Sequence, residues 1–356
     1  MEGSPADIVL FAPLAPILGV LLFWFIQLLF IESERFLLEK IRPKHGPLCR
    51  FTNFLGILFQ TICHALGYTI TKSGISDFYI SVNYGRVAPK KERKGIFEWI
   101  ANAFLFIGPF FVPAILLLLC LIFLLQNGLE IITPSHLSGL EYTFGGQLTT
   151  FGTSLYSFGS SFFSFLVNID LLHPGHFGFL ILLIFLGMGI RPSYIGEKKI
   201  DRVDMIYDLR NIWNLIIHKP LYVLILVLFC YNIFYISFIF NQNWYVAIFS
   251  ILGWLSIISI TAIFIANLLL SLIKLTDEIP GKIKLVPYIS MPIFYVLLRL
   301  IFYFIPTDFT NFISLLLTIL LVVVITYILL NAKSDRFKTK RDIKLLKKKA
   351  KEEKDG

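Results

Sequence analysis

Residues 100–126 read IANAFLFIGPFFVPAILLLLCLIFLLQ and contain no charged side chain. An α-helix rises about 1.5 Å per residue, so about 20 apolar residues cross the roughly 30 Å of hydrocarbon in a bilayer. This run therefore predicts a transmembrane helix. Further strongly apolar runs occur at 8–31, 176–191, 220–240, 244–273, 285–305 and 310–331. Together they predict an all-α polytopic membrane protein with about seven transmembrane helices.

The composition of the whole chain supports the same class. Of its 356 residues, 56% are hydrophobic and 15% are charged, and the mean hydropathy is +0.77. Soluble domains have about 45–50% apolar and about 25% charged residues, so a water-soluble fold is excluded. The four cysteines (Cys49, Cys63, Cys120 and Cys230) are isolated, which argues against a disulfide framework or a zinc ribbon.

The net charge of +9 comes mostly from one end of the chain. Residues 332–356 hold eleven Lys and Arg against five Asp and Glu, which is +6 of the total. No basic groove with interleaved aromatic residues is present, so we do not expect nucleic acid as a partner. The expected partner is the lipid bilayer, and other membrane proteins are further candidates.

Lysine and arginine are distributed unevenly between the apolar runs. The connection 127–175 contains neither residue, whereas basic residues occur in 32–50, 71–99, 192–219, 274–284 and 332–356. Loops rich in Lys and Arg stay on the cytoplasmic side of a membrane. We therefore expect an integral membrane protein with an extracytoplasmic N-terminus and a cytoplasmic C-terminus.

An eighth apolar segment, 51–70, has basic residues on both sides. If it crossed the membrane, the basic residues of 71–99 would be translocated. We therefore expect a re-entrant or deeply tilted helix, with a full eighth span as the alternative. The β-branched and aromatic residues of FYISV, 78–82, predict a short β-like hairpin near 75–90.

This pattern predicts a transmembrane helical domain over 1–331 and a basic cytoplasmic tail over 332–356. Within the first region, 127–175 is rich in Ser, Gly, Thr and Phe and predicts a long extracytoplasmic loop without regular elements. The glycines near 144–147 are typical of a flexible turn.

Segment 51–70 also contains a short motif, HALGY. Its residues are His64, Ala65, Leu66, Gly67 and Tyr68. The motif resembles the HExxH helix of the site-2-type integral membrane metalloprotease family. The downstream order is similar to that family: a strand-like stretch, a basic loop and a span with Gly108 and Pro109. The resemblance covers about 51–115, within a protease-like core segment 51–126, and Arg191-Pro192-Ser193 resembles a later helix more weakly.

The chemistry of the motif departs from the family's pattern. In HExxH two histidines bind zinc and the Glu acts as general base. Here Ala65 replaces the Glu, and Tyr68 replaces the second His. A tyrosine with a pKa near 10 is a poor zinc ligand at neutral pH. The family's Asp-Gly motif occurs only at 355–356, so His64 alone can be carried over as a vestigial ligand.

The resemblance therefore implies a catalytically inactive site-2-protease-like protein that binds membrane segments or partner proteins. If the protein were active, it would be a zinc metalloprotease. We expect no cofactor, and zinc is the only candidate for one. The alternative is an unrelated membrane transporter or a scaffold subunit of a larger membrane complex. On that interpretation His64 is a packed histidine that hydrogen-bonds to a neighbouring helix.

A second group of metal-ligating residues lies at the start of the span 176–191. His173, His176 and the preceding Asp170 could join His64 in binding a divalent metal. The expected topology opposes this, because His64 approaches from the inside and the other three lie outside. Pro174 also disfavours regular helical spacing of the pair.

A few polar side chains lie inside the predicted spans. Arg299 should either snorkel to the interface, the interpretation we favour, or pair with Asp308, Asp170 or Glu141. Interhelical hydrogen bonds are expected from the three intramembrane asparagines. These are Asn102, Asn232 and Asn267.

Overall fold

The computed structural model describes residues 4–124, 141–193, 203–304 and 309–355, with side chains up to 332. The chain divides into two compact units. Unit 1 consists of residues 1–165 and 171–270, and unit 2 consists of residues 166–170 and 271–356. The two units are described separately below.

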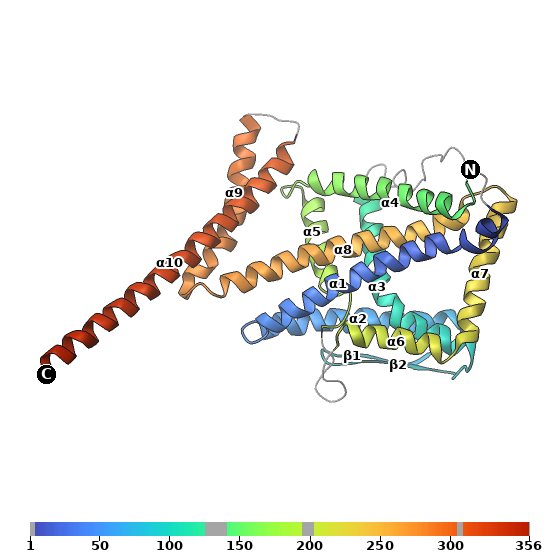
Figure 1. Ribbon diagram of the computed structural model, residues 1–356, viewed down its shortest axis with the longest axis horizontal. Helices are drawn as coiled ribbons and strands as arrows, with labels where there is room; N and C mark the ends of the chain where they lie inside the picture. The colour runs from blue at the N-terminus through green and yellow to red at the C-terminus, as the bar shows by residue number, and fades with distance from the viewer. Residues whose placement is uncertain (1–3, 125–140, 194–202, 305–308, 356) are drawn as a thin grey trace. The chain divides into compact units, whose positions relative to one another are not determined.

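Helices dominate unit 1. After the π-helical turn η1 (Asp7–Phe11), its elements follow in the order of the chain (Figure 1). They are α1 (Leu14–Ile41), α2 (Gly46–Ile70), β1 (Ile75–Ile80), β2 (Gly85–Pro89), α3 (Ile96–Leu124), α4 (Phe144–Val167), α5 (Pro174–Gly187), α6 (Met205–Ile217), α7 (Pro220–Ile239) and α8 (Trp244–Thr276).

Unit 2 contains three further elements. They are the 3-10 turn η2 (Gly281–Leu285), α9 (Val286–Phe304) and α10 (Thr310–Asp355). Residues 166–170 and the last part of α8 also belong to this unit. The basic tail predicted over 332–356 continues α10 as a helix up to Asp355.

In the described part of the chain, six helices are long and apolar enough to cross a membrane. They are Leu14–Ile41, Ile96–Leu124, Pro220–Ile239, Trp244–Thr276, Gly281–Phe304 and Thr310–Ala332. The predicted span 176–191 forms a shorter apolar helix, α5, of 14 residues. At about 1.5 Å per residue it is too short to cross about 30 Å of hydrocarbon alone. The predicted polytopic helical class is confirmed, whereas α5 is shorter than expected.

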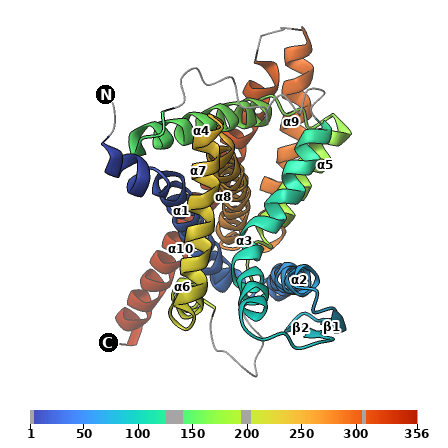
Figure 2. The same cartoon turned by 90° about the vertical axis from the view of Figure 1, so that its right-hand side faces the viewer.

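In unit 1, the elements that are poor in basic residues lie at one end of α3 and α7, and the elements that are rich in basic residues lie at the other end. Helix α4 runs crosswise at one end, and α2, the β1–β2 hairpin and α6 lie at the other (Figures 1 and 2). The Asp7 carboxylate accepts a hydrogen bond from the Phe144 backbone N–H, 3.2 Å from Oδ2, so the beginning of the chain lies at the α4 end. This arrangement groups the elements as the Lys and Arg distribution predicted.

The hairpin predicted near 75–90 is confirmed, and it packs against α2. Strands β1 and β2 are antiparallel, with Phe78 opposite Val87 and Tyr79 opposite Arg86. Helix α2 is continuous and is not among the candidate spans. Because α2 is one unbroken helix, segment 51–70 does not turn back within its own length, and the predicted re-entrant form is wrong.

Helix α4 corrects the prediction that 127–175 lacks regular elements. The Gly, Ser and Thr residues suggested a loop, but large apolar residues recur every three or four positions and are buried along one face. They are Phe151, Leu155, Phe158, Phe162 and Phe165. The close approaches to this helix come from glycines of its neighbours, because a β-carbon built on Gly19 of α1 would overlap the Phe151 ring and one on Gly253 of α8 would overlap the Leu155 side chain. The predicted turn at 144–147 is the first turn of this helix.

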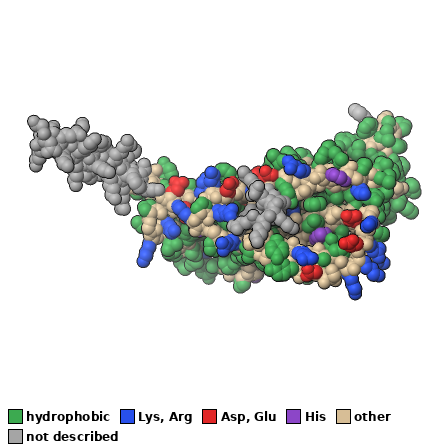
Figure 3. Space-filling view, turned by 90° about the horizontal axis from the view of Figure 1, so that it is seen from below, with side chains coloured by type: hydrophobic (Ala, Val, Ile, Leu, Met, Phe, Trp, Pro, Cys, Tyr) green, Lys and Arg blue, Asp and Glu red, His purple; other side chains and the backbone are tan. Residues whose placement is uncertain are grey.

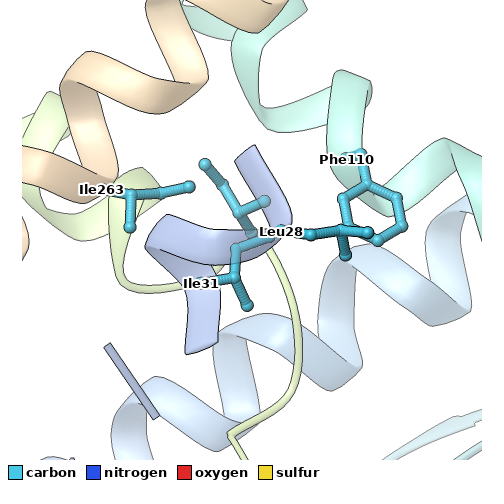
Figure 4. Close-up of a cluster of buried hydrophobic side chains, with 5 residues drawn as sticks. Leu28, Ile31, Phe110 and Ile263 are labelled. Atoms are coloured by element: carbon cyan, nitrogen blue, oxygen red, sulfur yellow. The ribbon is translucent and has the colours of Figure 1, made fainter. Parts of the chain in front are cut away.

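The core of unit 1 forms where α1, α3 and α8 meet. Leu28 and Ile31 of α1, Phe110 of α3 and Ile263 of α8 point toward one another (Figure 4). All four side chains are nearly inaccessible to solvent, and Ile190 completes the cluster. A polar bond crosses the same junction, because the Gln27 side chain donates to the Phe110 carbonyl at 2.9 Å. This core holds the segment before Arg191 against α1.

Candidate functional site

The HALGY motif lies in the second half of α2. The rings of His64 and Tyr68, one turn apart, have centroids 4.4 Å apart. His64 Nε2 is buried and has no hydrogen-bond partner among the described residues. Burial lowers the pKa of His64, so its ring is neutral at pH 7. The hydrogen bond to a neighbouring helix that we expected from a packed His64 is absent at Nε2.

The residues around His64 do not fit a zinc site. Burial, and then the charges of Glu98 and Glu92, raise the pKa of Tyr68, which keeps its hydroxyl protonated. The methyl group of Ala65 offers no ligand and no base. No group of three His, Cys, Asp or Glu that could hold a metal occurs among the residues that the structure describes. His64 is therefore not part of a set of three such ligands among the described residues, whereas zinc sites in proteins use three or four protein ligands.

The other predicted metal ligands make different contacts. His173 is the N-cap of α5, and its Nδ1 accepts a hydrogen bond from the His176 backbone N–H at 3.4 Å. The two imidazole rings lie 4.6 Å apart. Asp170 belongs to unit 2, where its carboxylate is bound by other residues. The His173 side chain thus caps the start of α5.

In unit 2 Arg299 is paired, contrary to the snorkelling that we favoured. Its Nη2 lies 2.9 Å from Oδ2 of Asp170. The Tyr295 hydroxyl, one helical turn earlier on α9, donates to Oδ1 of the same carboxylate at 3.2 Å. Asp308, the partner nearest in the chain, lies outside the described residues.

The three asparagines differ from one another. Asn267 of α8 donates to the Phe30 carbonyl of α1 at 3.2 Å, which is the interhelical bond expected. Asn232 instead donates to the Leu228 carbonyl of its own helix at 2.8 Å, so the expectation of an interhelical bond was wrong there. Asn102 lies half-buried on α3.

A buried charge cluster that the sequence analysis did not predict lies in unit 1. Asp208 of α6 receives Arg35 of α1 on one carboxylate oxygen, at 2.9 Å, and Arg191 on the other. The three side chains are 1%, 6% and 2% exposed, respectively. We call Arg35, Asp208 and Arg191 the buried charge triad. It joins α1 to two segments that come much later in the chain.

The surroundings of the triad are partly polar and partly aromatic. Glu32 Oε2 lies 3.5 Å from Arg35 Nη1 and accepts the Met205 backbone N–H at 3.0 Å, at the start of α6. The Arg191 guanidinium carbon lies 5.2 Å from the centre of the Phe110 ring, within range of a cation–π contact. Burial alone would raise the pKa of Asp208, but the charges of Arg191 and Arg35 outweigh it and hold that pKa below its usual value.

The sequence contained only an indirect signal for the triad. Arg35 and Arg191 each lie at the end of a long apolar run. We interpreted Arg35 as a topological charge, and Arg191 only as part of the weak resemblance at 191–193. Asp208 lies in an amphipathic helix between basic residues and carried no motif. Only the pairing across 173 residues of chain, between Arg35 and Asp208, distinguishes these charges from their neighbours.

The helices and their composition define the class: the chain is a polytopic α-helical integral membrane protein. No family model, no curated protein and no solved structure matches it.

Proposed function

We propose that this protein is a catalytically inactive relative of the site-2-type membrane proteases that binds an extended segment of another membrane protein. The observation that carries the proposal is the order and packing of α2, the β1–β2 hairpin and α3. A helix bearing the vestigial motif, a β-hairpin on that helix and a span with Gly108 follow one another, as in the family that the sequence resembles.

These three elements pack closely enough to act as one rigid support. A β-carbon built on Gly108 of α3 would lie 2.8 Å from Cβ of Cys63, and one on Gly67 of α2 would lie 2.9 Å from Cα of Ala101. The Asn53 side chain of α2 donates to the Val82 carbonyl of the hairpin at 2.9 Å. A β-carbon on Gly85 would overlap the Thr61 hydroxyl, so the sheet lies directly on α2.

The sheet has two strands, so the outer edge of β1 pairs with no strand in the described part of the chain. The Ser81 N–H bonds to the Tyr84 carbonyl across the hairpin. Alternation along an antiparallel ladder then directs the backbone N–H and C=O of Phe78 away from β2. An extended peptide can add to such an edge through main-chain hydrogen bonds.

The replacements in the motif favour binding over cleavage. Ala65 cannot take a proton from a water molecule, and the neutral ring of His64 belongs to no group of three metal ligands among the described residues. A segment that adds to β1 would therefore be held without being cut.

Proline substitutions on the two strands test the proposal. Phe78→Pro removes the outward N–H of β1, while Val87→Pro removes the N–H on the opposite edge of the sheet at the paired position. The probe is a synthetic single-span peptide whose cytoplasmic half is extended by glycines, with binding measured by fluorescence transfer in nanodiscs. We expect Phe78→Pro to weaken binding at least about tenfold, the loss of roughly 1.4 kcal/mol, and Val87→Pro and Phe78→Leu to leave it near the parent value.

Two results would contradict the proposal. Equal binding by the parent and Phe78→Pro would exclude the β1 edge, and cleavage of the peptide would exclude the inactive site. Metal analysis of the purified protein gives an independent check. One zinc per chain, lost in His64→Ala, would overturn the degenerate site.

A further inference from the structure

A cluster of basic side chains lies where two membrane-spanning helices begin side by side. Lys90, Lys91, Arg93 and Lys94 are exposed and precede α3, which begins at Ile96. Lys219, also exposed, is the N-cap of α7. We call these five residues the juxtamembrane basic patch.

Contacts between the two helices bring the two parts of the patch together. A β-carbon built on Gly95 would lie 3.2 Å from the Tyr222 hydroxyl, and the rings of Trp99 and Tyr222 have centroids 6.2 Å apart. The Trp99 ring N–H also donates to the Leu215 carbonyl of α6 at 2.9 Å. The starts of α3 and α7 and the end of α6 therefore form one continuous surface.

The aromatic residues place this surface at the level of lipid headgroups. Trp and Tyr concentrate at membrane–water interfaces, and Trp99 and Tyr222 lie within the first turn of two candidate spans. Helix α6 adds exposed apolar side chains on one face, at Ile206, Trp213 and Ile217. Such a helix is typical of one that lies in the plane of the interface.

The charge balance of the surface favours an anionic ligand. Around the five basic residues of the patch lie two carboxylates, Glu92 and Glu98, so the local charge is +3. The Arg93 guanidinium carbon lies 5.1 Å from the centre of the Phe97 ring, and that contact leaves its N–H groups able to donate. The space-filling view from below shows Lys and Arg side chains exposed among apolar ones on this face (Figure 3).

We propose that the juxtamembrane basic patch binds the headgroups of acidic phospholipids. Four or more basic residues immediately beside a span attract anionic lipid. Trp99 and Tyr222 would contact the upper part of the acyl chains, while the Lys and Arg side chains reach the phosphate. This binding is independent of the β1 edge and would anchor the starts of α3 and α7 to the membrane surface.

The test measures lipid binding by the purified full chain in a non-ionic detergent. The protein is titrated with phosphatidylglycerol or phosphatidylcholine of equal chain length, and retained lipid is counted by native mass spectrometry. The variant replaces Lys90, Lys91, Arg93 and Lys94 by Gln. The control makes the same charge change at Lys40, Arg42, Lys44 and Arg50, which are exposed beside α1 and α2.

We expect the parent and the control to prefer phosphatidylglycerol and the patch variant to bind it at least about tenfold more weakly, because each basic residue near an acidic headgroup adds to the attraction. A charge-retaining variant, with Lys→Arg and Arg93→Lys, should bind like the parent. Equal loss in the control and the patch variant would overturn the proposal. The proposal would also be overturned if inorganic phosphate displaced the bound lipid and chloride at the same ionic strength did not. Displacement of the lipid by an acidic peptide would overturn it as well.

Discussion

Both units contain an aspartate held by arginine, but the two sites differ in burial and in charge. In unit 1 Asp208 is shared by Arg35 and Arg191, and all three side chains are 6% exposed or less. In unit 2 Asp170 and Arg299 are 24% and 21% exposed, and Tyr295 supplies the second hydrogen bond. The first site is enclosed by protein, whereas the second is partly exposed at the protein surface.

This difference determines what each site can contribute. A charge that loses its partner at a buried position remains uncompensated, while a partly exposed one can turn toward water. The triad should therefore hold α1, α6 and the segment at Arg191 in one arrangement. The Arg299–Asp170 pair should stabilise unit 2 only moderately. The following experiments compare the two sites, beginning with the largest expected effect.

Replacing Asp208 by Asn should destabilise the protein by about 3–5 kcal/mol, because two buried guanidinium groups lose the carboxylate that they share. The measurement is the free energy of unfolding in detergent, from thermal or denaturant curves. Asp204→Asn is the matched control, because Asp204 caps α6 by accepting the Tyr207 N–H at 2.7 Å and Asn caps equally well. A loss in Asp208→Asn no larger than in the control would show that the triad is not a stabilising contact.

The stabilisation by Asp208 should also depend on pH. The charges of Arg191 and Arg35 hold its pKa below the usual value despite burial, so its contribution is complete above the unfolded-state pKa of about 3.9 and declines as the pH falls through the folded-state pKa. The difference in unfolding free energy between the parent and Asp208→Asn should be constant near neutrality and shrink in acid. A difference that grows on acidification would contradict this.

Gly56→Ala should destabilise by about 1–3 kcal/mol through overpacking. A β-carbon at Gly56 would lie 2.6 Å from the carbonyl carbon of Arg191, so the added methyl group displaces the backbone that presents Arg191 to Asp208. At Gly152 of α4 a β-carbon meets nothing within 4 Å. Gly152→Ala should therefore stabilise by about 0.5–1 kcal/mol, through helix propensity alone. If the two substitutions have equal effects in thermal unfolding, the backbone at Arg191 is not tightly held.

The smallest effects are expected in unit 2. Arg299→Leu and Asp170→Asn should each destabilise by about 1–2 kcal/mol. Hydrogen bonds to charged groups contribute about 1.5–3 kcal/mol, and partial exposure reduces that contribution. Arg299→Lys should lose less, because Lys reaches the carboxylate or the interface but cannot present the same planar group. Thermal unfolding of the three variants and of the Arg299→Leu/Asp170→Asn double variant measures the coupling. Additive losses would falsify the pair.

Several features could be predicted from local sequence. The spans followed from runs such as 100–126, and the hairpin followed from FYISV, because hydropathy and β-propensity are properties of neighbouring residues. Helix α4 was missed because its Gly, Ser and Thr residues are typical of loops, and we gave their composition more weight than the spacing of the apolar residues. Its Phe residues carried the helical spacing, and that signal could have been used.

The sequence by itself determined that this protein lies in a membrane and which connections carry its basic residues. Those properties depend on the transfer of each segment from water to lipid, and each segment contributes independently. Only the tertiary structure decided that Arg35 and Arg191 share Asp208 and that Arg299 meets Asp170. A charge near the end of a span has the same local pattern whether it faces water or another charge. Its partner is set by how distant helices pack, so it cannot be predicted from the neighbouring residues alone.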